Sequence, residues 1–156
     1  MEKEPDVRKT YEQLRAKHKL PLFEELDTAF EISTIESDNF LLREIRRKIT
    51  ERLRDISGLV ERLLQPEANL IDMYESKAYT EEEKAVIFEQ YRRLIIADRL
   101  SIEAELSNDE KMDAAFISSI SQEWKAMKPG LIAFVKRLRE TWESEADDNE
   151  KAGYMG

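Results

Sequence analysis

The sequence predicts an all-α protein: a single-domain bundle of about five to seven helices with two long antiparallel helices at its centre. Three observations favour this class. Apolar residues recur at steps of three and four along nearly the whole chain, which is the spacing of one helix face. The alternation of apolar and polar residues that marks strands is missing over any useful length. Glycine and proline number only four each among 156 residues, so few positions interrupt a helix.

The first half of the chain contains the clearest periodicity. Asp6 can cap a first helix that should end near Lys19. Pro21 suits the first turn of a second helix. Polar side chains over 33–39 interrupt the pattern, because they compete for backbone hydrogen bonds. A long third helix is expected over about 39–64. Its apolar residues form one continuous stripe: Leu42, Ile45, Ile49, Leu53, Ile56, Val60 and Leu63.

The second half predicts further helices. A short helix or turn should occupy 67–79, and a second long helix should run over 80–106, antiparallel to the third. Thr80-Glu81-Glu82-Glu83 opens this helix as a capping box, in which Thr80 and Glu83 exchange side-chain hydrogen bonds with backbone N–H groups. Ser107-Asn108-Asp109-Glu110 predicts a second capping box. Pro129 should break the helix that follows and start the last one.

The helical pattern covers 1–146, which we expect to form one domain, whereas 147–156 should be a flexible tail without an apolar period. The longest stretch without charge, 114–122, is too short to span a bilayer. The first six residues lack the apolar core of a signal peptide. We therefore expect an acidic, soluble, cytoplasmic protein without membrane contact, and the lack of cysteine fits a reducing compartment.

The composition excludes several kinds of chemistry. Without cysteine there is no disulfide, zinc finger or thiol catalysis, and a single histidine cannot build a histidine-rich metal site. Four glycines cannot form a glycine-rich phosphate loop. We therefore expect no cofactor and assign no metal or catalytic residue. His18 continues the apolar stripe of the first helix, and we expect it to be partly buried near that helix's C-terminus.

Charge is strongly segmented along the chain, with a net charge of −9 overall and no basic residue over 21–39. Four arginines lie on one side of the third helix: Arg43, Arg46, Arg47 and Arg54. One interpretation is that acidic and basic helices pair across their outer faces. The other is that these arginines bind a partner protein, together with Tyr154 and Met155 of the tail. Direct binding of nucleic acid is not expected, because the acidic chain repels a polyanion.

Carboxylates support a rival hypothesis. Glu24 and Asp27, like Glu110 and Asp113, are three residues apart and share a helix face, and Mg²⁺ prefers such oxygens. The alternative functions are therefore a Mg²⁺-dependent all-α nucleotide hydrolase and a nucleic-acid-associated accessory factor. Pairs at this spacing also arise by chance among 34 acidic residues. Asp98, a further candidate, falls on an inward stripe, and we expect it to pair with an arginine of the facing helix.

Large aromatic side chains are expected in the core rather than in a binding site. The residues concerned are Phe116, Trp124, Phe134 and Trp142.

Two runs carry a resemblance to known proteins. Leu20-Pro21-Leu22-Phe23-Glu24-Glu25-Leu26-Asp27 and Phe40-Leu41-Leu42-Arg43-Glu44-Ile45-Arg46-Arg47-Lys48-Ile49 resemble uncharacterised small all-helical proteins of archaea, a resemblance that implies no activity. Arg46-Arg47-Lys48-Ile49 and Thr80-Glu81-Glu82-Glu83 are also similar to the helical domain of archaeal GINS replication-complex subunits, although the small β domain of those subunits has no counterpart here. This second resemblance implies a role in assembly.

The leading hypothesis from the sequence is a non-catalytic helical module that binds other proteins, or itself. Long amphipathic helices with segregated charge offer docking faces, and no catalytic constellation is convincing.

Overall fold

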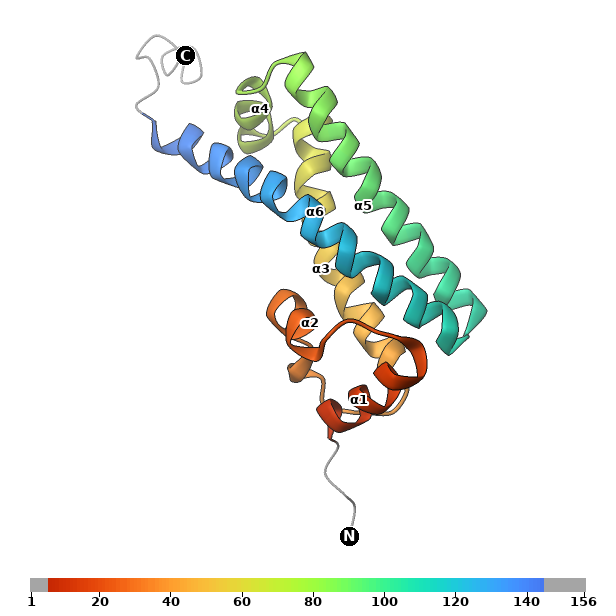
Figure 1. Ribbon diagram of the computed structural model, residues 1–156. Helices are drawn as coiled ribbons and strands as arrows, with labels where there is room; N and C mark the ends of the chain where they lie inside the picture. The colour runs from red at the N-terminus through yellow and green to blue at the C-terminus, as the bar shows by residue number, and fades with distance from the viewer. Residues whose placement is uncertain (1–5, 145–156) are drawn as a thin grey trace.

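The structure is a computed structural model that describes residues 6–144. These residues form six α-helices and one short 3-10 turn, with no strand among them, which confirms the all-α prediction (Figure 1). The helices are α1 (Val7–His18), α2 (Phe23–Phe30), α3 (Leu41–Leu64), α4 (Leu70–Lys77), α5 (Glu81–Ser107) and α6 (Glu110–Glu143), and the turn η1 is Ile32–Thr34. The tail 147–156, with Tyr154 and Met155, lies outside the described residues.

Three long helices form the centre of the molecule. α3 and α5 lie along each other, and α6 packs against both (Figure 1). The α3–α5 pair is antiparallel, as predicted, because Arg46 contacts Ser101 whereas Arg54, further along α3, contacts Asp98, which is earlier in α5. α1 and α2 cover the first half of α3, and α4 lies beside its end (Figure 1).

The apolar stripe of α3 lies at the centre of the hydrophobic core. Six of its seven predicted residues are buried, and Ile56 packs against them. The facing side of α5 is built differently: apart from Leu94, its buried residues are small or polar, namely Ala97, Asp98, Ser101 and Ala104. Because this narrow stripe covers little apolar surface, several large apolar side chains of α5 stay on the outside, among them Ile96 at 46% exposure and Leu100 at 42%.

Local signals set most helix starts. Asp6 caps α1 by accepting a hydrogen bond from the N–H of Lys9, and the predicted capping box of Thr80 and Glu83 is present. The second predicted box is wrong. Ser107 still belongs to α5, the left-handed Asn108 ends that helix, and Asp109 caps α6. The direct α5–α6 junction leaves no room for a separate capping segment.

The structure corrects the predictions for two prolines. Pro21 stays outside α2, which begins at Phe23, and its carbonyl accepts the Tyr11 hydroxyl at 2.6 Å. The predicted break at Pro129 is absent, and α6 continues through it. A proline inside a helix costs about 3 kcal/mol. Met127 and Leu131 on either side of Pro129 are both buried on one face, so core packing over the whole of α6 outweighs that cost.

The aromatic prediction holds for two of the four residues. Phe116 and Phe134 are buried in the core. Trp124 is partly buried and packs against the core from its edge. Trp142 is not a core residue: it is 46% exposed, lies on the Tyr74 ring and donates its indole N–H to Glu75. Among residues 6–144, none of the helices combines the length and the apolar character needed to cross a membrane.

Candidate functional site

The four arginines predicted as a binding face line one side of α3, but the structure gives them different environments. Arg46 is only 2% exposed. Its Nε donates to Asp113 of α6 at 2.6 Å, its Nη1 donates to the hydroxyl of Ser101 at 2.8 Å, and its Nη2 contacts Glu105. This side chain therefore joins α3, α5 and α6, and little of its surface faces the solvent.

The other three arginines are near the surface and also have partners within the chain. Arg47 forms ion pairs with Glu105 and Glu44. Arg43 donates a hydrogen bond to Asn108. Arg54 donates to Asp98 at 2.6 Å. A shallow pocket of about 290 Å³ runs between α3 and α5 here, with Arg46, Arg47 and Arg54 on its wall. Pairing between basic α3 and acidic α5 is thus observed, and a partner-binding role for the four arginines stays a prediction.

Glu105 is the acidic centre of this arrangement, and it makes stability depend on pH. Hydrogen bonds from Arg47 and then Arg46 lower the pKa of Glu105 from 4.5 to about 2. Because folding lowers this pKa, the stabilisation is complete above pH 4.5 and is lost as the pH falls toward 2.

We therefore expect Glu105→Gln to lower the free energy of unfolding by about 1 kcal/mol at pH 6, since solvent screens its partly exposed pairs. Urea titrations at pH 6, 4, 3 and 2.5 should show this difference shrinking toward zero. Glu103→Gln, an exposed neighbour on α5 without an ion pair to any described residue, is the control. A difference that persists unchanged at pH 2.5 would contradict this role for Glu105.

The carboxylates of the Mg²⁺ hypothesis do not converge. Glu24 pairs with Arg8, and Asp27 accepts from the N–H of Ser33 at 2.8 Å. Asp113 is held by Arg46, as described above. Within residues 6–144 there is no group of three or more acidic or histidine side chains arranged to hold a metal ion.

His18 and Glu110 meet at the surface, where His18 Nε2 lies 2.7 Å from Glu110 Oε1. Lys17 pairs with the same carboxylate. The His18 side chain is 9% exposed at the last residue of α1, as expected from its place in the apolar stripe. The prediction for Asp98 is also confirmed, since it is buried and pairs with Arg54 of the facing helix.

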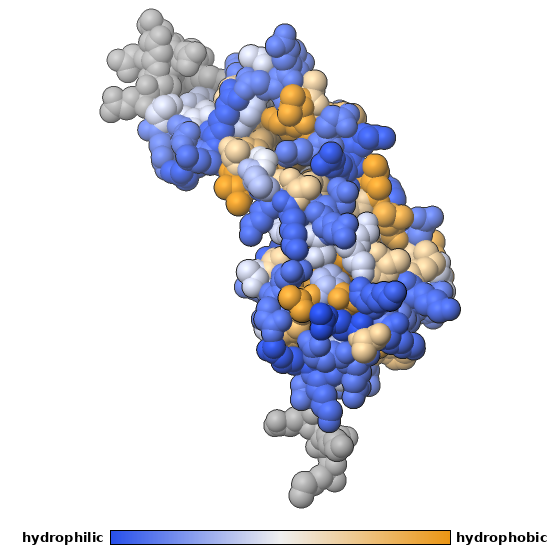
Figure 2. Space-filling view, in the orientation of Figure 1, coloured by the Kyte–Doolittle hydropathy of each residue, from blue (hydrophilic) through white to orange (hydrophobic). Residues whose placement is uncertain are grey.

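A groove of about 230 Å³ lies between α5 and α6, on the other side of α5 from the arginines. We call it the α5–α6 groove; its lining is Arg93, Ile96, Ala97, Leu100, Phe116, Ser119, Ile120 and Glu123. Ala97, Phe116 and Ile120 are buried and form its floor, whereas Ile96 and Leu100 stand exposed on its α5 side. Figure 2 shows hydrophobic side chains in orange along the edge of the molecule where Figure 1 places α5.

Two opposite charges flank the α5–α6 groove, Arg93 from α5 and Glu123 from α6. Neither makes an ion pair with any residue in 6–144, in contrast to Arg46, Arg47 and Arg54 of α3. On the α6 side, Ala115, Ser119 and Ala126 are exposed and share one helix face with the longer, also exposed Gln122. The small side chains at Ala115, Ser119 and Ala126 allow another helix to approach closely.

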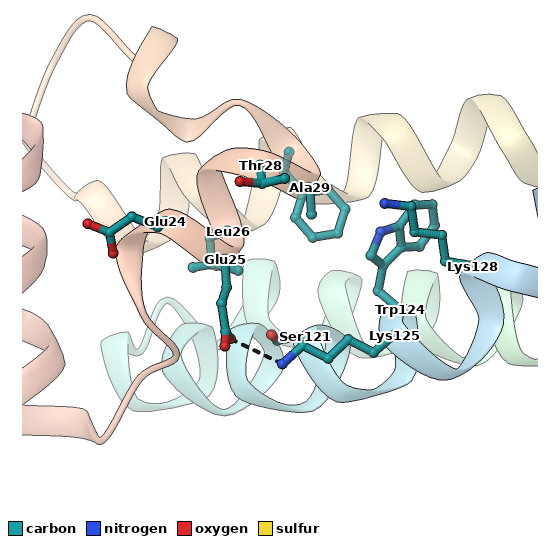
Figure 3. Close-up of a pocket in the computed structure, with 10 residues that line it drawn as sticks. Glu24, Glu25, Leu26, Thr28, Ala29, Ser121, Trp124, Lys125 and Lys128 are labelled. Atoms are coloured by element: carbon teal, nitrogen blue, oxygen red, sulfur yellow. Dashed lines mark ion pairs between the residues drawn. The ribbon is translucent and has the colours of Figure 1, made fainter.

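A second pocket, of about 370 Å³, lies between α2 and α6 (Figure 3). Its apolar wall includes Phe30 of α2 and Trp124 of α6, whose ring centroids are 5.4 Å apart. Glu25 and Lys125 pair across its edge at 3.3 Å. Lys128, one turn after Trp124, also lines this α2–α6 pocket but makes no ion pair with a described residue.

Sequence reasoning missed both features for the same reason: each depends on which helices become neighbours. One local signal was available for the groove. Ile96 and Leu100 are four residues apart and fall off the Ile87, Tyr91 and Leu94 stripe, which indicates a second apolar stripe on α5. The α2–α6 pocket had no such signal, because Trp124 shares its period with core residues.

Comparisons with known proteins return no relative: no protein-family model, no curated protein and no solved structure matches the chain. The resemblances noted in the sequence therefore stay predictions.

Proposed function

We propose that this protein is a non-catalytic assembly subunit that binds a second copy of itself through the α5–α6 groove. The observation that carries the proposal is the pair of exposed apolar side chains, Ile96 and Leu100, beside a groove with an apolar floor. Burying exposed apolar surface contributes about 25 cal/mol per Å². The sequence resemblance to GINS helical domains agrees with an assembly role.

The shape of the surface suits a helix as the occupant. α6 offers small side chains at Ala115, Ser119 and Ala126, and α5 offers larger ones at Ile96 and Leu100. A helix from a second copy can therefore place its large side chains over the small ones of the first. Two α5–α6 pairs packed in this way form a four-helix arrangement around a shared apolar layer.

The charges favour a second copy over an unrelated partner. Arg93 and Glu123 carry one positive and one negative charge on the two sides of the same groove. In a two-fold symmetric dimer each contact between the copies occurs twice, so Arg93 of each copy can pair with Glu123 of the other. A groove with one charge of each sign is therefore complementary to itself. The net charge of −9 opposes association at low salt, so physiological ionic strength is the proper condition.

The cytoplasmic location predicted from the sequence belongs to this proposal as well. A chain without cysteine needs no oxidising compartment for its stability.

Sedimentation velocity between 5 and 200 µM in 150 mM salt tests the proposal. We expect the wild type to form dimers, and the double variant Ile96→Glu/Leu100→Glu to associate at least a hundredfold more weakly, because it buries two charges in an apolar layer. Leu70→Glu/Ile71→Glu on α4 is the matched control, since these side chains are similarly exposed outside the groove. A wild type that stays monomeric at 200 µM overturns the proposal, as does a control that disrupts the dimer equally.

A further inference from the structure

We infer that the α2–α6 pocket binds a small hydrophobic monocarboxylate. This inference is independent of the proposed self-association, because the pocket lies on α2 and the other side of α6 and shares no lining residue with the α5–α6 groove. It rests on the size and apolar wall of the pocket, on an unsatisfied buried donor, and on one unpaired positive charge.

The buried donor is the indole N–H of Trp124. Its nitrogen is buried and has no hydrogen-bond acceptor among residues 6–144. Leaving a buried donor unsatisfied costs about 1–3 kcal/mol. Such groups in folded proteins usually find an acceptor, from the protein, from water or from a ligand. By contrast, the indole N–H of Trp142 already donates to Glu75 Oε2 at 2.9 Å.

Lys128 supplies the charge beside this donor. In the view of Figure 3, the Nζ of Lys128 and the indole nitrogen of Trp124 are drawn on the same side of the Trp124 ring. Lys128 has no ion pair with a described residue, whereas Lys125 on the same rim is already paired with Glu25. Trp124 and Lys128 are four residues apart on α6 and line the same pocket, so the indole N–H and the ammonium are two donors that one carboxylate can bridge.

Charge and shape define the ligand class. With respect to partners within 6–144, Lys128 is the one unpaired positive charge of the pocket, so it can neutralise a single carboxylate. A phosphate ester or a polyanion brings excess negative charge next to Glu24 and Glu25, which line the opposite side. The apolar wall of Phe30, Ala29 and Trp124 suits an aromatic or branched aliphatic body. A volume of about 370 Å³ is at the small end of ligand pockets, which fits a compact acid.

The test uses 4-phenylbutyrate as the probe and ¹⁵N–¹H correlation spectra of the wild-type protein at pH 7. The two indole N–H signals are assigned with Trp124→Phe and Trp142→Phe. We expect the Trp124 signal to shift and saturate on titration, with the Trp142 signal as an internal control that stays in place. The neutral analogue 4-phenylbutanamide should bind at least tenfold more weakly, because it cannot pair with Lys128.

Variants separate the pocket from nonspecific binding. Lys128→Gln should weaken 4-phenylbutyrate binding at least tenfold, whereas Lys136→Gln, an exposed lysine two turns further along α6, should leave it unchanged. The inference is overturned if the Trp124 signal does not move at 10 mM probe, or if both indole signals move together. It is also overturned if Lys128→Gln binds 4-phenylbutyrate as tightly as the wild type, because the carboxylate of the probe then does not pair with Lys128.

Discussion

Replacing Arg46 with methionine is expected to lower the free energy of unfolding by about 3–5 kcal/mol. The guanidinium is 2% exposed, and the carboxylate of Asp113 that it holds is 5% exposed. Removing the arginine leaves that carboxylate buried without its charge partner, which costs far more than the loss of a surface ion pair. Urea unfolding followed by circular dichroism at one protein concentration gives the difference directly.

Two further variants identify the cause of that loss. Arg46→Met/Asp113→Leu removes both charges, so it should regain at least about 2 kcal/mol relative to Arg46→Met. Arg47→Met removes the neighbouring, half-exposed arginine and should cost no more than about 1 kcal/mol. Equal losses for Arg46→Met and Arg47→Met, or a double variant less stable than Arg46→Met, would contradict a buried pair between Arg46 and Asp113.

Tyr11→Ala is the second substitution with a large expected effect, about 3–5 kcal/mol, the range for deleting a buried aromatic ring. Tyr11 is fully buried, its ring meets the edge of Phe23 at 5.7 Å, and its hydroxyl donates to the carbonyl of Pro21. It therefore fixes α1 and the start of α2 against the core. Tyr11→Phe keeps the ring and loses one hydrogen bond, so it should cost only about 1 kcal/mol.

Tyr11 should also make the stability of the protein depend on pH in the alkaline range. Burial raises the pKa of the Tyr11 hydroxyl above its ordinary value of 10. A raised pKa means that the neutral form stabilises the fold, fully below pH 10 and progressively less above it. The stability difference between the wild type and Tyr11→Phe should therefore shrink as the pH rises from 9 to 11. A constant difference over that range would show that the hydroxyl is exposed to solvent.

Much of the fold follows from local patterns. The α3 stripe, the Asp6 cap and the Thr80–Glu83 capping box depend on residues within one or two turns, and each is present in the structure as predicted. Pro129 shows where local reasoning stops. Its effect on α6 depends on the burial of Met127 and Leu131 against other helices, and the sequence of one helix does not contain that information.

In the candidate sites, too, local features could be predicted from the sequence and contacts between distant helices could not. The spacing of the α3 arginines correctly places them on one side of the helix, and the inward position of Asp98 correctly predicts its pairing with an arginine. That Arg46 is buried against Asp113 could not be predicted, because the two residues lie on helices far apart in the sequence. The α5–α6 groove and the α2–α6 pocket are likewise products of tertiary packing.

Mixing two charge-reversed variants tests the central claim, self-association through the α5–α6 groove, most directly. Arg93→Glu alone should weaken the dimer about tenfold or more, since it sets two carboxylates against each other at both symmetry-related contacts. Glu123→Arg alone should do the same by setting two guanidinium groups against each other. An equimolar mixture restores both opposite-charge contacts, so it should sediment as a dimer with near wild-type affinity. A mixture that stays as dissociated as each variant alone, beside a dimeric wild type, would contradict the proposed interface.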